Sequence, residues 1–147
     1  SGDRDSRFLG FWQIDRVERR TTDGREVPTP QYGQGYLIYM PSGYMMVQLM
    51  RPDRALHEGA RPTATEAVDA MQSYVSYVGS FKVDSDEGVV VHRRDGHLNP
   101  NMAGDDVSRA FEFRNDQLIL KPPVSNVDGQ ELQTFVYWTH LSVFGSY

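Results

Sequence analysis

Short runs of alternating apolar and polar residues cover most of this chain, and turn-forming residues separate them. A period of two is typical of strands that are buried on one face. The pattern predicts eight strands, with the ranges 9–20, 35–40, 44–50, 79–84, 88–94, 107–114, 117–121 and 131–143. Pro41-Ser42-Gly43 and Asn115-Asp116 suit the turns of antiparallel hairpins.

The segment 64–78 departs from this alternation. Its apolar residues recur at helical spacing, at Ala67, Val68, Met71, Tyr74, Val75 and Val78. Such spacing predicts an amphipathic helix. Thr63 and Glu66 stand at the positions of a capping box, and we expect Gly79 to end the helix. The helix would separate the third strand from the fourth.

Eight mostly antiparallel strands with one helix predict an up-and-down β-barrel. Closure removes the exposed edges of the sheet, and an eight-stranded barrel holds side chains or one small ligand inside. A two-sheet sandwich is the alternative that periodicity leaves open. We expect a single domain over residues 1–147, with a flexible N-terminus at residues 1–7.

Several stretches resemble a known family. Gly10-Phe11-Trp12 resembles the opening Gly-x-Trp motif of lipocalins, and GYLIYMPSGYMMVQLMRPDR (35–54), SYVSYVGSF, VVVHRR and HLNPNMAGDDVSRAFEF follow in order. Together they resemble the bacterial and fungal lipocalin-like domain family over about residues 9–141. The resemblance implies a barrel with an internal cavity and no particular reaction, although some members lie among natural-product biosynthetic enzymes. The family's last strand tends to carry Trp-x-Arg, whereas this chain has Trp138-Thr139-His140.

Composition narrows the classes of partner. The chain has 147 residues, of which 39% are hydrophobic and 24% are charged, and this balance indicates a globular fold. A net charge of −5 argues against a nucleic-acid partner. No run of apolar residues approaches membrane-spanning length, so we expect no membrane partner. The lack of cysteine fits a cytoplasmic protein.

Two hairpins allow side chains to be assigned to faces, because directly opposed residues share a face. A two-residue loop at Asn115-Asp116 places Phe111 opposite Leu120, on a face that also carries Arg109. An arginine pointing inward needs a partner or water, unless it lies at the rim and reaches outward.

The second hairpin concerns a histidine. A four-residue loop at 85–88 places Val83 opposite Val90, and Phe81 opposite His92. His92 then points into the barrel beside Phe81. A loop longer or shorter by one residue would turn it outward.

The hairpin 36–50 has two largely apolar faces, so something must cover the outer one. The predicted helix or a second copy of the chain, in a homodimer, would do so. We assign Tyr36, Met46 and Gln48 to the cavity, because that face combines aromatic and polar groups. The opposite orientation, with Leu37 and Met45 inside, is the alternative.

These assignments give a candidate site. His92 and Arg109 are the candidate catalytic residues, and the ligand-binding candidates are Tyr36, Gln48, Met46, Tyr74, Phe81, Phe111 and Trp138. The four histidines lack the spacing of metal ligands and no cofactor motif is present, so we expect neither a metal nor a cofactor.

Three functions fit this set. The first is a carrier that binds a small apolar or aromatic metabolite. The second is a cofactor-free isomerase, cyclase or dehydratase, in which Arg109 polarises a carbonyl and His92 moves a proton. The third is a homodimeric structural protein whose interior is filled by its own side chains.

Overall fold

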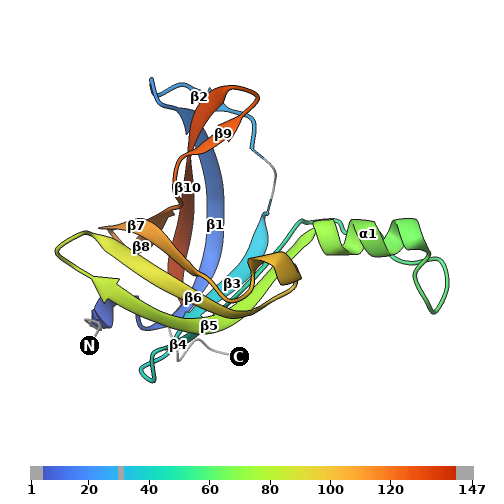
Figure 1. Ribbon diagram of the computed structural model, residues 1–147, viewed down its shortest axis with the longest axis horizontal. Helices are drawn as coiled ribbons and strands as arrows, with labels where there is room; N and C mark the ends of the chain where they lie inside the picture. The colour runs from blue at the N-terminus through green and yellow to red at the C-terminus, as the bar shows by residue number, and fades with distance from the viewer. Residues whose placement is uncertain (1–4, 30–31, 142–147) are drawn as a thin grey trace.

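In the computed structural model, which describes residues 5–29 and 32–141, eight antiparallel strands close into a barrel (Figure 1). They are β1 (Gly10–Thr21), β3 (Gln34–Tyr39), β4 (Tyr44–Met50), β5 (Tyr74–Asp84), β6 (Val89–His97), β7 (Asp106–Arg114), β8 (Gln117–Lys121) and β10 (Gln130–Leu141). Each pairs with the next in this order, and β1 pairs with β10. Closure confirms the predicted barrel and excludes the sandwich.

Four short elements lie outside this prediction. The strands β2 (Glu26–Val27) and β9 (Ser125–Val127) pair with the far parts of β1 and β10, which extend beyond the barrel as a ribbon (Figure 1). The 3₁₀ helices are η1 (Ser6–Phe8) and η2 (Pro100–Met102). Residues 1–4 and 142–147, where parts of the expected N-terminal segment and last strand fall, lie outside the described residues.

The helix α1 (Ala64–Gln72) begins as predicted and ends early. Thr63 and Glu66 form the capping box. The prediction of helix through residue 78 is wrong, because 74–78 form the first half of β5 and pair with β4. Aromatic and β-branched residues dominate this segment, and such side chains favour strands. The helix still lies between the third and fourth barrel strands.

Gly79 therefore has a different role from the one expected. It lies at a bulge where β5 shifts its register against β6. A Cβ atom at Gly79 would lie 1.7 Å from the carbonyl oxygen of Arg93. The glycine allows the two backbones to approach closely at the bulge.

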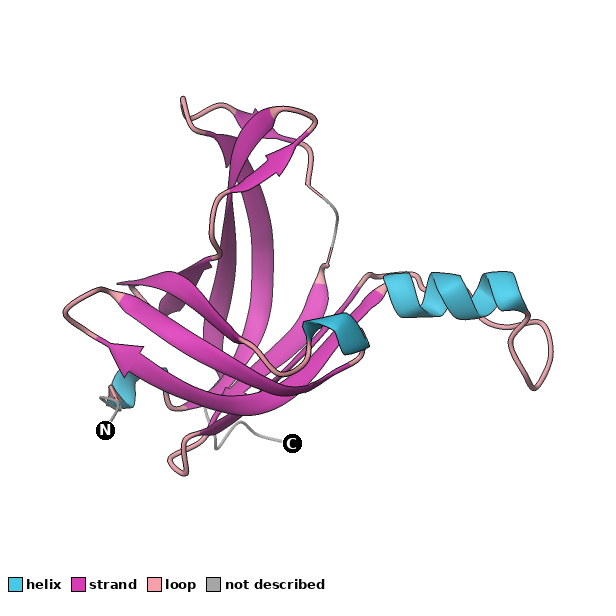
Figure 2. Cartoon of the chain, in the orientation of Figure 1, coloured by secondary structure: helices cyan, strands magenta, loops and turns pink. Residues whose placement is uncertain are grey.

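The helix does not cover the outer face of the 36–50 hairpin. It extends away from the barrel (Figure 2) and buries none of its own side chains. The prediction that the helix covers this face is therefore wrong. The face is exposed in the single chain, where 40% of Tyr36 and 59% of Tyr44 is accessible.

Aromatic residues close one end of the barrel. Phe8, on η1, is fully buried and makes edge contacts with Tyr39, Phe111 and Phe113. Its carbonyl oxygen accepts a 2.8 Å hydrogen bond from the indole N–H of Trp12. The core therefore continues from this end into the barrel interior, where His92, Phe81 and Trp138 are buried.

Candidate functional site inside the barrel

His92 points into the barrel, as its hairpin predicts. It lies directly opposite Phe81, and only 1% of its surface is exposed. The other predicted register is also present, with Phe111 opposite Leu120. The sequence predicts the loop length of both hairpins. Because loop length determines which residues are opposed, the inward faces of both hairpins are predicted correctly.

Two tyrosine hydroxyl groups hold the His92 ring. The Tyr39 hydroxyl lies 2.6 Å from Nε2, and the Tyr77 hydroxyl lies 2.8 Å from Nδ1. These residues come from β3, β5 and β6, so the hydrogen bonds join three strands across the interior. We call this set the Tyr–His–Tyr cluster.

The surroundings keep the cluster uncharged. Burial lowers the pKa of His92 well below its usual value, and the Arg109 and Arg94 cations act in the same direction. Burial also raises the pKa of Tyr39 and of Tyr77. For Tyr77 the two arginine cations oppose that effect. At neutral pH the cluster is therefore a neutral imidazole between two protonated phenols.

Two arginines lie near the cluster. Arg109 is half-buried on β7, opposite Val90, so it shares the inward face with His92. Arg94 has 11% of its side chain exposed, and its guanidinium makes a 2.8 Å ion pair with Asp105. Among the described residues, Arg109 has no such carboxylate partner. Of these two arginines, Arg109 is therefore the one whose guanidinium could bind an anion or a carbonyl oxygen.

Three of the predicted ligand-binding residues line the interior. Phe81 and Trp138 are buried, and Phe111 is half-buried against Phe8. The indole N–H of Trp138 is buried without a hydrogen-bond partner among the described residues. A buried donor without an acceptor costs about 1–3 kcal/mol.

The hairpin 36–50 has the orientation opposite to the one assigned. Tyr36 and Met46 are each 40% exposed on the outer surface, whereas Leu37 and Met45 are buried inside. Leu37 lies directly opposite the buried Trp12, which determines the inward face. The two apolar faces of the hairpin could not be distinguished by their pattern alone.

Two further candidates also lie on the outer face and not in the cavity, because Gln48 is directly opposite Tyr36 and Tyr74 alternates with the inward Val75 and Tyr77. Gln48 is half-buried and donates a 2.9 Å hydrogen bond to the hydroxyl oxygen of Ser76. Tyr74 is half-buried, with the Arg54 guanidinium 5.0 Å from its ring centroid. Neither residue contacts the Tyr–His–Tyr cluster through a described hydrogen bond or ring contact.

Sequence reasoning missed both tyrosines of the cluster. Tyr77 fell within the expected helix, and Tyr39 fell on the face that was assigned outward. The sequence contains a signal for Tyr77, because Val75, Tyr77 and Phe81 are separated by even numbers of positions and would share one face of a continuous strand. All three contribute to the core. A signal for Tyr39 was its spacing of two from Leu37.

A hollow of about 190 Å³ lies where β5 begins and β6 ends. It is lined by Met71, Gln72, Tyr74, Val75, His97, Leu98, Asn99 and Met102. The ring of His97 stacks on Tyr77, with 5.5 Å between ring centroids. The stack connects this hollow with the tyrosine that contacts His92.

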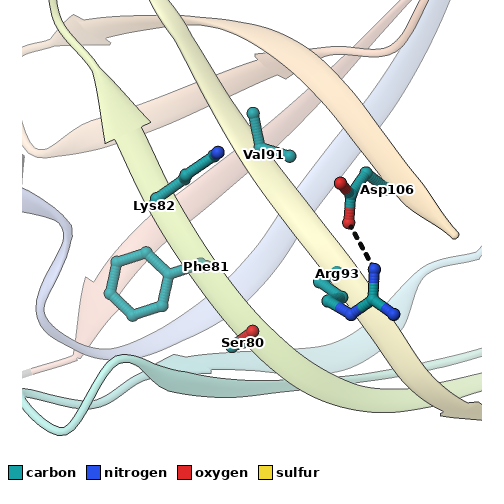
Figure 3. A pocket seen from close by; sticks show the side chains of 6 residues that line it. All are labelled: Ser80, Phe81, Lys82, Val91, Arg93 and Asp106. Atoms are coloured by element: carbon teal, nitrogen blue, oxygen red, sulfur yellow. Dashed lines mark hydrogen bonds and ion pairs between the residues drawn. The ribbon is translucent and has the colours of Figure 1, made fainter. Parts of the chain in front are cut away.

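A second hollow, of about 220 Å³, lies along β5, β6 and β7 (Figure 3). Two of its three charged lining residues are paired with each other, because the guanidinium of Arg93 lies 3.3 Å from a carboxylate oxygen of Asp106. Lys82 and Arg93 are exposed there. The Tyr–His–Tyr cluster is the stronger candidate, because it is buried and Arg109, which lacks a carboxylate partner among the described residues, hydrogen-bonds to its Tyr77.

The described residues contain no group of three or more histidine or acidic side chains that could hold a metal ion. None of the helices in the described part of the chain has the length and apolar character needed to cross a membrane.

A closed eight-stranded antiparallel barrel is the architecture of lipocalins and of some other up-and-down barrels, and this fold supports a general role in ligand binding. The model of the family described as "Lipocalin-like domain" matches residues 9–141. The chain therefore belongs to the lipocalin-like domain family. None of the curated proteins compared with the chain matches it.

Proposed function

We propose that this protein binds a small apolar or aromatic metabolite inside the barrel, with a carbonyl or carboxylate oxygen of the ligand held at Arg109. The observation that carries the proposal is the inward-facing arginine without a carboxylate partner among the described residues, next to a buried neutral cluster. A guanidinium in an apolar interior is stabilised when an acceptor pairs with it. The unpaired indole N–H of Trp138 supports a ligand with an acceptor group.

Two probes of the same shape test this proposal. These are 2-naphthoate, which carries a carboxylate, and 2-methylnaphthalene, which does not. We expect both to quench the fluorescence of the buried Trp12 and Trp138. Arg109→Ala should weaken the binding of 2-naphthoate by roughly 10- to 100-fold, which corresponds to the loss of a charged hydrogen bond, and should leave 2-methylnaphthalene nearly unaffected.

Arg93→Ala is the matched control, because Arg93 lies on the same strand as His92 and is exposed on the outer surface. It should bind both probes as the wild type does. If neither probe binds the wild type, or if Arg109→Ala binds 2-naphthoate normally, the proposal is wrong.

A cofactor-free isomerase, cyclase or dehydratase is the second candidate. The observation that favours it is the continuous series of hydrogen bonds from Tyr39 through His92 to Tyr77, along which a proton could pass. His92→Ala separates the two functions once a natural ligand is in hand. A carrier would lose at most about tenfold in affinity, whereas an enzyme would lose turnover by about a hundredfold with binding nearly intact.

A further inference from the structure

We infer that the Tyr–His–Tyr cluster is directional, with Tyr39 donating to His92, His92 donating to Tyr77, and the Tyr77 hydroxyl donating to an oxygen atom of the bound ligand. This inference rests on the proposed function and deepens it. It assigns the ligand contact to Tyr77 and gives His92 the role of a positioning residue.

The first step follows from the chemistry of imidazole. A neutral histidine has one N–H donor and one bare nitrogen acceptor. Both His92 nitrogens lie within hydrogen-bond distance of a tyrosine hydroxyl, at 2.6 Å and 2.8 Å. One tyrosine must therefore donate to the ring, and the other must accept from it. The accepting tyrosine keeps its own proton for a different partner.

Burial decides between the two arrangements. Tyr39 is 1% exposed, and among the described residues its hydroxyl has His92 as its hydrogen-bond partner and no other. If Tyr39 accepted, its proton would be a buried donor without an acceptor, at a cost of about 1–3 kcal/mol. Tyr39 therefore donates to Nε2, which leaves the proton of His92 on Nδ1, pointing at Tyr77.

Tyr77 is suited to the remaining role. It is more accessible than Tyr39, at 6%, and it stacks on His97 beside the hollow at the start of β5. The Arg94 guanidinium lies 5.8 Å from its ring centroid. Positive charge near a phenol strengthens it as a donor, because the oxygen gains negative charge when it donates. The matching ligand group is a carboxylate or an enolate-like or ketone oxygen.

The tautomer of His92 is the most direct test, and it needs no ligand. Protein with ¹⁵N-labelled histidine, studied near pH 7.5, should show the His92 proton on Nδ1 and a bare Nε2, with the signals assigned by their loss in His92→Gln. A proton on Nε2 would overturn the inference and leave the proposed function standing.

Binding provides the second test. Tyr77→Phe should weaken the binding of 2-naphthoate by roughly tenfold and leave the binding of 2-methylnaphthalene unchanged. Tyr39→Phe removes a hydroxyl behind the histidine, so it should retain the affinity for 2-naphthoate within about threefold. Wild-type affinity for 2-naphthoate in Tyr77→Phe would overturn the inference. Failure of both probes to bind the wild type would instead remove the proposed function on which it rests.

A separate observation carries a second inference. We propose that two copies of the chain associate through the outer face of β1, β3, β4 and β5. Phe11, Ile38, Met46 and Val78 form one continuous row across these strands, each opposite the next. The outward residues of the adjoining row are Gln13, Tyr36, Gln48 and Ser76, all uncharged.

The size of this face matches a dimer interface. Phe11, Tyr36, Met40, Tyr44, Met46 and Val78 are each 38–59% exposed. At about 200 Å² for a large side chain, they leave about 500 Å² of apolar surface accessible. A standard interface buries about 800 Å² per partner, of which about 65% is apolar in homodimers.

The row also complements itself. It has the bulky Phe11 at one end, and beyond Val78 at the other end it meets Gly96, which has no side chain. A two-fold axis through the middle of the row would place Phe11 of each copy over Val78 and Gly96 of the other, as an isologous interface requires.

Sedimentation velocity at micromolar concentration tests the second inference. The wild type should sediment as a dimer, and Met46→Lys as a monomer. Val68→Lys, on the exposed helix α1, is the control that should stay dimeric. A wild-type monomer at about 100 µM, or a dimeric Met46→Lys, would overturn the proposal and leave this face to a different partner.

Discussion

The hydroxyl group of Tyr39 lies 2.6 Å from Nε2 of His92, although 53 residues separate them in the chain. The contact joins β3 to β6 through the barrel interior and leaves His92 fully enclosed. Because Tyr77 occupies the other nitrogen, the imidazole has no free position for direct contact with a ligand. Any effect of His92 on a ligand would therefore pass through a tyrosine.

The buried histidine predicts how stability depends on pH. The unfolded chain takes up a proton at His92 near pH 6.5, whereas burial keeps the folded-state pKa well below that value. The folded state therefore has its full stability above pH 6.5. Below pH 6.5 the free energy of unfolding falls by about 1.4 kcal/mol per pH unit, until the folded-state pKa of His92 is reached. His97, whose pKa burial also lowers, adds in the same direction.

Denaturant unfolding of the wild type and His92→Gln at pH 8 and pH 5.5 measures this effect. The wild type should lose more stability than the variant between these values. His57→Gln, on an exposed residue, is the control and should behave as the wild type does. Equal losses in the wild type and His92→Gln would contradict the prediction.

Leu118→Asp should destabilise the barrel severely. Leu118 is completely buried between Phe113 and Trp138, and a carboxylate there would have no partner. We expect a loss above about 3 kcal/mol and a melting temperature lower by roughly 10 °C. Ala110→Asp, at an exposed outward position on β7, should change the melting temperature little. An unchanged melting temperature in Leu118→Asp would refute the face assignment.

Gly79→Ala tests the close approach at the bulge. The added Cβ atom would meet the carbonyl oxygen of Arg93 at 1.7 Å, so β5 and β6 must separate locally. We expect a loss of about 2–4 kcal/mol in the free energy of unfolding. Gly59→Ala, in an exposed loop where an added Cβ atom would make only an ordinary contact, 3.9 Å from the carbonyl oxygen of Arg61, is the matched control. Similar stability of the two variants would mean that the bulge relaxes without cost.

Hairpins with short loops could be predicted from the sequence. The registers that place Phe81 opposite His92 and Phe113 opposite Leu118 both came from loop length and alternation, and both are confirmed. These contacts are local, so the loop length leaves few ways to pair the strands. The inward direction of His92 follows from the same information.

The segment 74–78 shows where local information was insufficient. Its apolar residues satisfy both the helical spacing from Met71 and the alternation of a strand. Pairing with β4 decides the outcome, since it supplies backbone hydrogen bonds over the whole of Tyr74–Ser80. The two paired segments are far apart in the chain, so a local sequence pattern cannot predict that they pair.

By itself the sequence determined the order of the strands, the helix start at the Thr63 capping box and the inward faces of two hairpins, because each depends on neighbours within one turn or loop. Only the tertiary structure decided that Leu37 and Tyr39 face inward and that Tyr39 and Tyr77 enclose His92. The 36–50 hairpin has two apolar faces, so its orientation depends on Trp12, which lies on another strand. Closure of the barrel brings these distant side chains together, and their hydrogen bonds exist only in the closed form.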